Sequence, residues 1–406
     1  MADIFLITHY EPIPVGHGGH HRSYQLLFDL EQFVGSENVK TIVTPLYSHQ
    51  LNQLTKRLLW RSITGMVRVS QRVMGLFWYL LYLGDIHRAL TRIRPMEKFG
   101  YRLKFFSELS GYQESVRRVK KPFICIIDHP YFECFIDINE KYGIPTILCA
   151  HNLESVDAFI SDRWLYVDAM KACVLFADEY KCLARCDHRI MISAVDKSVV
   201  DGLGLSSEYY SYIPVGKILE RQQSIRLQRQ ARSQEPGLLL LLGSYYHLTT
   251  AEGMVWLLEG LGRLINPNFP LRLVVAGNGT QHLKEKISSM DWIEIKGWIA
   301  QEELDELFVR VQGVLIPQRL GFGVVTRLSE LACAGIPMVV SEHPTRAFEN
   351  PPGLSVAGES IEDWIVAIER LARGKITGAS AAEYAEWVSR QPNGLIPTLK
   401  KYIETK

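Results

Sequence analysis

Glycines, histidines and an arginine cluster near the start of the chain, where an apolar run gives way to a helical pattern. The run "DIFLIT" leads into "GHGGHHRSYQLLFDL", residues 16–30. Such residues suit a metal site, a phosphate cradle made of backbone amides, or a tight turn. His20 and His21 are adjacent and would diverge on a helix, and no nearby acid completes a ligand set. We therefore predict no metal here, and expect Gly18 and Gly19 to let the backbone approach an anion.

A second glycine pair has the same setting in the other half of the chain, in "PQRLGFGVVTRLSELACAGIPMVVS", residues 317–341. A strand is predicted to end at Pro317, and a helix to begin near Val325 after a Gly-Phe-Gly loop. Loop amides and a helix N-terminus bind anions, and Arg327 adds a guanidinium able to hold phosphate bidentately. Glu330, one turn further on, could accept hydrogen bonds from ribose hydroxyls. The alternative is a turn with a surface ion pair.

Histidines also follow two predicted strands, in "IIDHPYF" (Asp128, His129) and "LCAHNLES" (His151, Asn152). A polar residue just past a buried strand of a parallel sheet faces the ligand-binding edge. His151 could bind a sugar hydroxyl or a developing charge, although a capping and turn-forming cluster would have the same residues. No Ser/His/Asp or Cys/His catalytic signature and no P-loop is recognisable.

The elements that must position these residues alternate between short apolar runs and longer helical patterns. This alternation predicts an α/β protein with two doubly wound, Rossmann-like parallel sheets that face each other across a cleft. We expect an N-terminal domain over residues 1–218, a polar linker over 219–236, a C-terminal domain over 237–379 and a closing helix over 380–406 that crosses back toward the N-terminal domain.

Composition narrows the class of protein. The 406 residues are 47% hydrophobic with a net charge of +1, which gives no general reason to expect nucleic-acid binding. The seven cysteines are scattered and predict reduced thiols in a cytoplasmic protein. "MADIFLITHY" has no basic region before its apolar run and is interpreted as a strand rather than a signal peptide.

One segment departs from this neutral balance. Between residues 51 and 105 there are eleven Lys and Arg, opposed only by Asp85 and Glu97, around the apolar "MGLFWYLLYLGDI". Basic residues mixed with aromatic ones suit a helix on an anionic membrane surface or an acidic acceptor. A buried helix flanked by solvated arginines is the alternative. The first interpretation would make the protein peripheral on the inner face of a membrane.

Seven stretches together resemble family 4 glycosyltransferases with the GT-B fold, in order and at similar spacing. They are "GGHHRSYQLL", "CAHNLES", "DHRIMIS", "LLGSYY", "VVAGNG", "IEIKGW" and "GFGVVTRLSELACAGIPMVVS". The resemblance implies an enzyme that moves a sugar from a nucleoside diphosphate donor, of UDP or GDP type, to a glycan, lipid-linked or protein acceptor. It also implies a metal-independent reaction without a cofactor, which retains the anomeric configuration.

The resemblance assigns roles to residues by motif. Gly18 and Gly19 would approach the donor diphosphate, His151 would contact the donor sugar and Glu330 would hold the ribose. Residues 297–299 would flank the base. Together with the residue chemistry above, the expected catalytic residues are His151 and Arg327, and the expected donor-binding residues are Gly18, Gly19, Gly297, Trp298, Arg319, Gly321, Phe322, Gly323 and Glu330. Arg22, Asp128 and His129 are the candidates on the acceptor side.

Three departures from the common family pattern bear on these roles. Phe322 stands where a glutamate is usual, and "GSYYHLTTAEGM" lacks the usual Arg and Lys after the first strand of the second domain. Val215 replaces the usual Asn before the linker glycine. The chain resembles the branch with Gly-x-Gly-x-x-x-Lys before Glu330, with Arg327 in the basic place and Arg319 as a further source of charge.

The departures leave alternatives open. A GT-B subunit that has lost catalysis, and binds glycans or supports another transferase, would tolerate them. A sugar-nucleotide epimerase would use the same fold without an acceptor. The nucleotide, the sugar, the acceptor and the oligomeric state are not predicted by any residue pattern.

Overall fold

The computed structural model describes residues 3–44, 106–118, 123–156, 169–265, 269–285, 290–321, 323–347 and 349–403. Two predictions fall outside these residues. They are the membrane-surface segment 51–105 and the place of Phe322 in the glycine loop.

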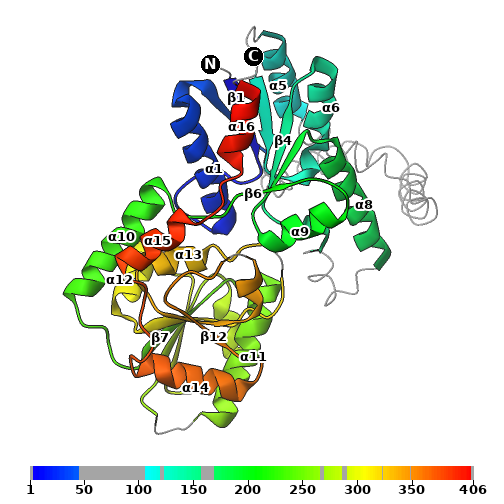
Figure 1. Ribbon diagram of the computed structural model, residues 1–406. Coiled ribbons are helices and arrows are strands. Elements are labelled where there is room, and N and C mark those ends of the chain that lie inside the picture. Colours follow the sequence, from blue (N-terminus) through cyan, green and yellow to red (C-terminus); the bar gives the residue numbers. More distant parts are fainter. Residues whose placement is uncertain are drawn as a thin grey trace, which may run out of the picture.

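The N-terminal domain is built on a parallel sheet whose described strands lie in the order β2-β1-β3-β4-β5-β6 (Figure 1). The strands are β1 (Asp3–Thr8), β2 (Val39–Val43), β3 (Phe123–Ile127), β4 (Thr146–Ala150), β5 (His188–Met191) and β6 (Glu208–Tyr209). Every residue of β3 and β4 is buried, which explains their nearly unbroken apolar sequences "FICII" and "TILCA". The helices are α1 (Gly18–Val34), α5 (Phe106–Arg118), α6 (Glu133–Tyr142), α8 (Ala169–Arg185) and α9 (Ala194–Gly202), with short 3-10 turns η1 (Ser36–Asn38) and η2 (Pro130–Phe132).

The C-terminal domain repeats this plan, and its described strands lie in the parallel order β12-β11-β10-β7-β8-β9. They are β7 (Leu238–Leu242), β8 (Arg272–Ala276), β9 (Ile293–Gly297), β10 (Gly313–Ile316), β11 (Met338–Ser341) and β12 (Leu354–Ala357). The helices are α11 (Leu248–Leu264), α12 (Gln301–Arg310), α13 (Arg327–Cys333) and α14 (Ile361–Ala372), with 3-10 turns η3 (Thr280–Glu285) and η4 (His343–Arg346). The predicted α/β class with two doubly wound sheets is confirmed.

Both faces of each sheet are covered, so each domain has two apolar cores. On β1, Ile4 and Leu6 join the core that contains α1, whereas Phe5 and Ile7 join the core on the opposite face. This alternation follows from the two-residue period of a strand. Burial on both faces fixes the register of the central strands and therefore the height at which their loops emerge.

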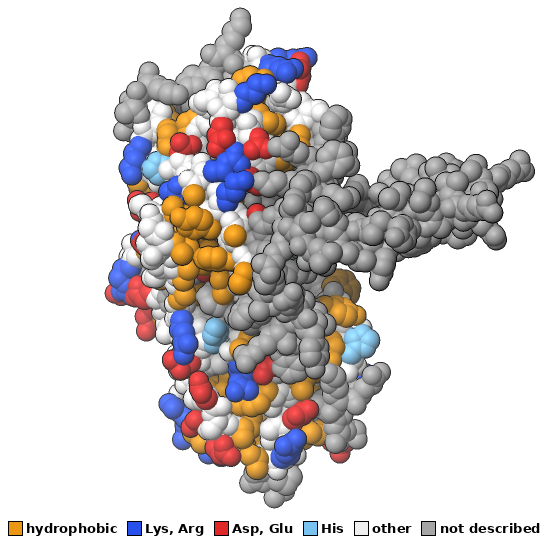
Figure 2. Space-filling model, turned by 90° about the vertical axis from the view of Figure 1, so that its right-hand side faces the viewer, with side chains coloured by type: hydrophobic (Ala, Val, Ile, Leu, Met, Phe, Trp, Pro, Cys, Tyr) orange, Lys and Arg blue, Asp and Glu red, His pale blue; other side chains and the backbone are white. Residues whose placement is uncertain are grey.

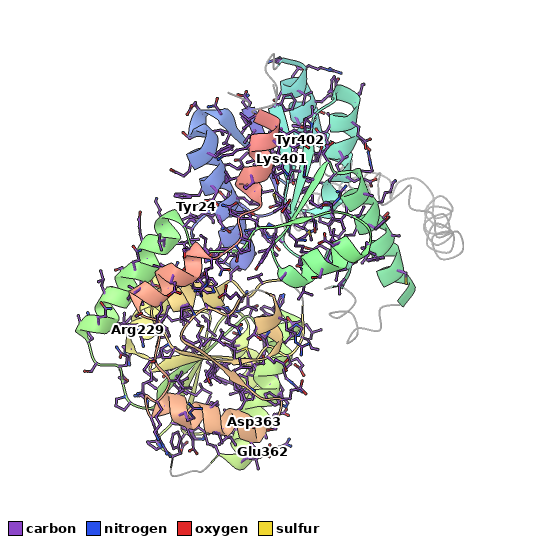
Figure 3. The ribbon with its side chains drawn as sticks, in the orientation of Figure 1. Tyr24, Arg229, Glu362, Asp363, Lys401 and Tyr402 are labelled. Carbon is purple, nitrogen blue, oxygen red and sulfur yellow. The ribbon has the colours of Figure 1, made fainter. Side chains whose placement is uncertain are left out.

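Most of the segment predicted as a linker forms a helix, α10 (Gly216–Ala231), which packs on α12 and α13. Arg226 donates from Nε to the carbonyl of Cys333 at 2.7 Å and from Nη2 to that of Ala332 at 2.7 Å. Arg229, labelled in Figure 3, donates to the carbonyl of Val311 at 2.8 Å. These guanidinium groups satisfy carbonyls at the ends of α13 and α12. The polar sequence of α10 therefore belongs to a packed helix.

Two helices end the described chain and lie on different domains (Figure 1). α15 (Ala381–Ser389) begins at a capping box formed by Ser380 and Glu383 and packs near α13. α16 (Leu395–Ile403) buries Leu395 and Leu399 in the N-terminal core. The described part of the chain thus returns to the N-terminal domain after completing the C-terminal one.

The described surface carries both signs of charge. On the face shown in Figure 2, Lys and Arg side chains are interspersed with Asp and Glu over both domains. This pattern matches the near-equal totals of 45 basic and 44 acidic residues. None of the helices in the described ranges is long and apolar enough to cross a bilayer.

Candidate active site

The strand order locates the binding edge of each sheet. In the first sheet β1 lies between β2 and β3, and in the second β7 lies between β8 and β10, so the chain reverses direction at β1/β3 and at β7/β10. Ligands of open α/β sheets bind beyond the carboxyl ends of the strands at such reversals. The loops after β1, β3 and β10, which carry several of the predicted site residues, emerge at these reversals.

The glycines before α1 are required by close neighbours. A Cβ on Gly19 would lie 2.4 Å from the ring of Tyr10, and a Cβ on Gly18 would lie 2.7 Å from Oγ1 of Thr326 in the C-terminal domain. Gly18 is therefore a point where the two domains touch. The amide of Gly19 is occupied within its own loop, because it donates to Nδ1 of His17 at 3.2 Å.

His20 and His21 point in different directions, as predicted for neighbours on a helix. His20 pairs through Nδ1 with the carbonyl of Glu11 at 2.9 Å, whereas His21 points across the domain boundary to Glu330. Over the residues that the structure covers, no group of three or more His, Cys, Asp or Glu side chains could hold a metal ion.

Asp128, which is buried, and His151, which is partly buried, form a pair at the ends of β3 and β4. Nε2 of His151 lies 3.1 Å from Oδ2 of Asp128, which also accepts a hydrogen bond from Ser23 at 3.0 Å. The backbone amide of His9 donates to Oδ1 at 2.9 Å. Ser23 and Asp128 approach the same ring nitrogen, so these three side chains cannot act as a nucleophile relay, which needs one partner on each nitrogen. Asp128 instead fixes the ring of His151.

His129 is buried beside this pair and faces another carboxylate. Its Nε2 lies 3.1 Å from Glu154, and its Nδ1 accepts from the amide of Tyr131 at 3.3 Å. Burial lowers the pKa of His129, but the charge and hydrogen bond of Glu154, together with the charges of Asp128 and Glu179, outweigh that effect, and the net pKa is raised. Neither His129 nor Asp128 is exposed, so in this arrangement an acceptor would meet them only through His151 or the loops above them.

Arg22 is also fully buried, away from the meeting point of the domains. Its guanidinium lies 4.1 Å from the ring centroid of Tyr210, donates to Gln25 at 2.7 Å and donates to the carbonyl of Tyr210 at 3.0 Å. Burial lowers the pKa of Arg22. These contacts give Arg22 a role in holding α1 against the segment after β6.

The glycine loop after β10 meets the His151 loop of the other domain. A Cβ on Gly323 would lie 3.2 Å from the carbonyl oxygen of His151, and both Gly321 and Gly323 have positive φ. Glycine is therefore needed here for the approach of the two domains as well as for backbone conformation.

The two arginines of this segment point to different places. Arg327 donates from Nη1 to the carbonyl of Leu242 at the end of β7, so its guanidinium lies at the β7/β10 reversal. Burial lowers its pKa, and the charge of Glu330 opposes that effect. Arg319 instead lies 4.5 Å from the ring centroid of Trp256 and 3.6 Å from Glu252, both on α11.

Glu330 is held from the N-terminal side of the boundary. Its Oε1 lies 2.7 Å from Nδ1 of His21 and accepts from the hydroxyl of Tyr212 at 2.8 Å. Burial raises the pKa of this carboxyl, but His21, Tyr212 and Arg221 together outweigh it and lower the pKa to about 2. The carboxylate is therefore ionised at neutral pH.

The loops after β7 and β9 present exposed aromatic side chains. Gly297 has φ of +79°, and Trp298 next to it is 72% exposed. Tyr246 in the loop after β7 is 64% exposed, and its hydroxyl lies 3.3 Å from Nε2 of His282. Exposed rings of this size near a binding edge are typical of ligand contacts rather than of a core.

The structure thus gathers Gly18, Gly323, His151, Arg327 and Glu330 around the contact between the two domains. It separates Arg319, Arg22 and His129 from that point by their own partners. Sequence reasoning missed Tyr212 and Ser23. Ser23 lies within the stretch "GGHHRSYQLL", but nothing in it marks the serine as a partner of Asp128, and Tyr212 lies near the end of the predicted N-terminal domain, before the predicted linker.

Residues 236–373 match the family model described as "Glycosyl transferases group 1". No curated protein matches the chain. Among solved structures, a sucrose-phosphate synthase from Thermosynechococcus elongatus has a TM-score of 0.60 at 14% identity, with 96% of this chain and 98% of that chain covered.

Two other solved structures align over nearly their whole length. WaaG, a glycosyltransferase involved in lipopolysaccharide biosynthesis, has a TM-score of 0.55 at 11% identity, with 98% and 99% of the two chains covered. HepE from Anabaena, in complex with UDP and glucose, has a TM-score of 0.53 at 9% identity, with 99% and 98% covered. At such identities these similarities show the fold. Together with the family match, they confirm the predicted resemblance to GT-B glycosyltransferases and the prediction of a sugar-transferring enzyme.

Proposed function

We propose that this GT-B glycosyltransferase, of the family 4 type, transfers a sugar with retention and without a metal. The donor is a nucleoside diphosphate sugar bound mainly by the C-terminal domain. The observation that carries the proposal is the convergence of an ionised carboxylate, Glu330, and a partly buried guanidinium, Arg327, one turn apart at the β7/β10 reversal.

These two groups suit two polar parts of a nucleoside diphosphate, the ribose and the diphosphate. A carboxylate accepts hydrogen bonds from neighbouring hydroxyls, so Glu330 is suited to the ribose diol. A guanidinium donates to phosphate oxygens with charge assistance, so Arg327 is suited to the diphosphate. Trp298 and Tyr246 supply exposed rings on which a base can stack.

Departure of the diphosphate is the step that these residues would assist. The bond between the anomeric carbon and the β-phosphate oxygen breaks, and the acceptor hydroxyl oxygen bonds to the same face of that carbon. The acceptor's proton passes to the departing diphosphate. Arg327 would stabilise the charge that grows on the leaving group, and His151, held by Asp128, would orient the sugar.

The donor and acceptor are proposed more narrowly from the structural relatives. HepE is in complex with UDP and glucose, so UDP-glucose is the first donor to try. WaaG is involved in lipopolysaccharide biosynthesis, so a lipid-linked glycan is the first acceptor class. The basic and aromatic composition of residues 51–105 supports an acceptor at an anionic membrane surface and a peripheral location.

Turnover of the donor tests this assignment. We expect purified protein to hydrolyse or transfer the sugar of a nucleoside diphosphate donor, and both Glu330→Ala and His151→Ala to reduce turnover strongly. Unchanged turnover in both variants would overturn the assignment of the site. Product formed from the nucleotide sugar alone with a changed sugar configuration would favour an epimerase.

A catalytically inactive glycan-binding or scaffold subunit is the second candidate. Phe322 in place of a glutamate and the missing basic pair after β7 favour it. Such a subunit would bind a glycan or a partner transferase while showing no turnover with any donor, even though its fold and melting temperature are intact.

A further inference from the structure

Two residues from outside the C-terminal domain contact the carboxylate of Glu330 at hydrogen-bond distance. His21 comes from the first turn of α1, and Tyr212 from the segment that joins β6 to α10. The carboxylate itself lies on α13 in the C-terminal domain. Three elements that are distant in sequence therefore meet at one oxygen atom.

The protonation states make both partners donors. The pKa of Glu330 is lowered to about 2, so the group is a carboxylate and can only accept. Burial, reinforced by the neighbouring Glu330, raises the pKa of Tyr212 well above its ordinary value, so the phenol keeps its proton. Nδ1 of His21 must likewise carry a hydrogen to face the carboxylate at 2.7 Å.

His21 and Tyr212 both contact the same oxygen of the Glu330 carboxylate, Oε1. Within the described residues, the hydrogen bonds that reach this side chain end on Oε1. An ionised carboxylate accepts about four hydrogen bonds, two at each oxygen. Oε2 therefore keeps its capacity, which is what a pair of neighbouring hydroxyls requires.

Packing alone does not account for the histidine. His21 is only 5% exposed, and its Nε2 has no hydrogen-bond partner within the described residues. Burying an unpaired ring nitrogen is unfavourable, whereas a leucine or phenylalanine would fill the space without that cost. The useful property of His21 is its Nδ1–H, which it directs at Glu330.

We propose that His21 and Tyr212 are positioning residues, which fix Glu330 so that Oε2 receives the ribose diol of the donor. This inference rests on the proposed function, because it assumes that Glu330 binds a ribose. It also means that Glu330 is held in the orientation for binding the nucleotide only while the N-terminal domain contacts the C-terminal domain. Donor affinity would then depend on contacts that the C-terminal domain does not contain.

Nucleotide affinity measured by calorimetry tests the proposal with UDP and GDP as probes. His21→Phe keeps an aromatic ring but removes the Nδ1–H that donates to Glu330, and Tyr212→Phe removes only the phenolic hydroxyl. We expect each to weaken binding of the preferred nucleotide about tenfold, as for a lost hydrogen bond to a charged group. His21→Asn places an amide N–H near the position of Nδ1 and should restore most of the affinity.

Two matched variants control for general damage to the N-terminal domain. His188→Phe changes a histidine on β5 that packs edge-on against Tyr402, labelled in Figure 3, and Tyr112→Phe removes a buried hydroxyl that bonds Asn139. Neither residue contacts Glu330, so we expect both variants to bind nucleotide like the wild type. Melting temperatures of all variants without nucleotide show which remain folded.

A double-mutant cycle separates positioning from an indirect structural effect. In a Glu330→Gln background, His21→Phe should cost no further affinity, because the group that it positions has already been changed. Additive losses would overturn the proposal, as would unchanged or tighter binding by His21→Phe. If the wild type binds neither UDP nor GDP, the proposed function fails first and this inference fails with it.

Discussion

Arg327 and Arg319 lie eight positions apart on one segment, yet their guanidinium groups have different neighbours. Arg327 reaches the carbonyl of Leu242 at the end of β7, whereas Arg319 lies over Trp256 and beside Glu252 on α11. The charge of Arg319 is therefore partly compensated, and that of Arg327 is placed at the β7/β10 reversal. The two residues form a natural pair for comparison.

Arg327→Gln is expected to lower kcat/KM for the donor by about 100-fold, because a charge-assisted contact to the diphosphate is lost. Melting temperature should change little, since burial already opposes the charge of this side chain. Steady-state kinetics with a nucleoside diphosphate sugar provide the measurement. Arg319→Gln is the matched control, and a loss in Arg319→Gln as large as that in Arg327→Gln would contradict the assignment.

His9, whose backbone amide donates to Asp128, gives a prediction of how the free energy of unfolding depends on pH. Burial first, and then the nearby His129, lower the pKa of His9 from 6.5 to about 4, although Asp128 opposes them. The unfolded chain therefore takes up this proton more readily than the folded chain. Stability should be full above pH 6.5 and fall as the pH drops toward 4.

Urea unfolding at pH 7 and pH 5 measures this effect. We expect the wild type to lose about 1–2 kcal/mol from this residue between the two pH values. His9→Phe, which cannot titrate, should lose correspondingly less. An equal loss in the variant and the wild type would show that other groups carry the pH dependence.

The positions of charged site residues were predictable where these residues lie in a local sequence motif. The spacing of Gly321, Gly323, Arg327 and Glu330 places a cation and a carboxylate at one helix start, and the structure has them there. The contacts of Tyr212 and Ser23 were not predictable, because their partners Glu330 and Asp128 lie far away in the sequence. Arg22 was assigned to the acceptor side on its charge, but the structure buries that charge against Tyr210.

At the level of the elements, the turn before α1 depends on the small size of its glycines. A Cβ on Gly19 would lie 2.4 Å from the ring of Tyr10, which the same loop holds in place. Gly19→Ala should therefore lower the free energy of unfolding by about 1–3 kcal/mol, through displacement of the loop. It should also weaken nucleotide binding, because Gly18 and His21 belong to the same turn.

Gly111→Ala is the control for this change. Gly111 lies inside α5, and a Cβ there would have open space within 4 Å. Alanine should stabilise that helix by about 0.5–1 kcal/mol. Chemical denaturation distinguishes the two variants, and a stabilised Gly19→Ala would show that the loop tolerates a side chain.

The strands were predictable and the connection between the domains was not. Apolar runs such as "FICII" and "TILCA", in alternation with helical patterns, indicate central strands of a covered sheet, and the structure has them there. The polar segment after Gly216 buries only Ile218 and Ile225 among apolar side chains, while Arg226 and Arg229 bond carbonyls at helix ends. Because arginines share the buried face of this helix with the isoleucines, its hydrophobic pattern is too weak to predict a packed helix.

For the whole molecule, the alternation of strand-like and helical segments predicted the fold, but it did not predict which residues meet between the two domains. Gly18 against Thr326, Gly323 against His151 and His21 against Glu330 each join residues from opposite halves of the chain. A single sequence contains no signal for such pairs beyond the presence of small or polar residues in loops. These contacts nevertheless bring the two binding edges together.

Calorimetric titration of the wild type and Glu330→Ala with UDP and with GDP tests the central claim most directly. We predict that the wild type binds one of the two nucleotides with micromolar affinity and that Glu330→Ala weakens this binding at least tenfold. Failure of the folded wild type to bind either nucleotide, or equal binding by Glu330→Ala, would contradict the assignment of the donor site.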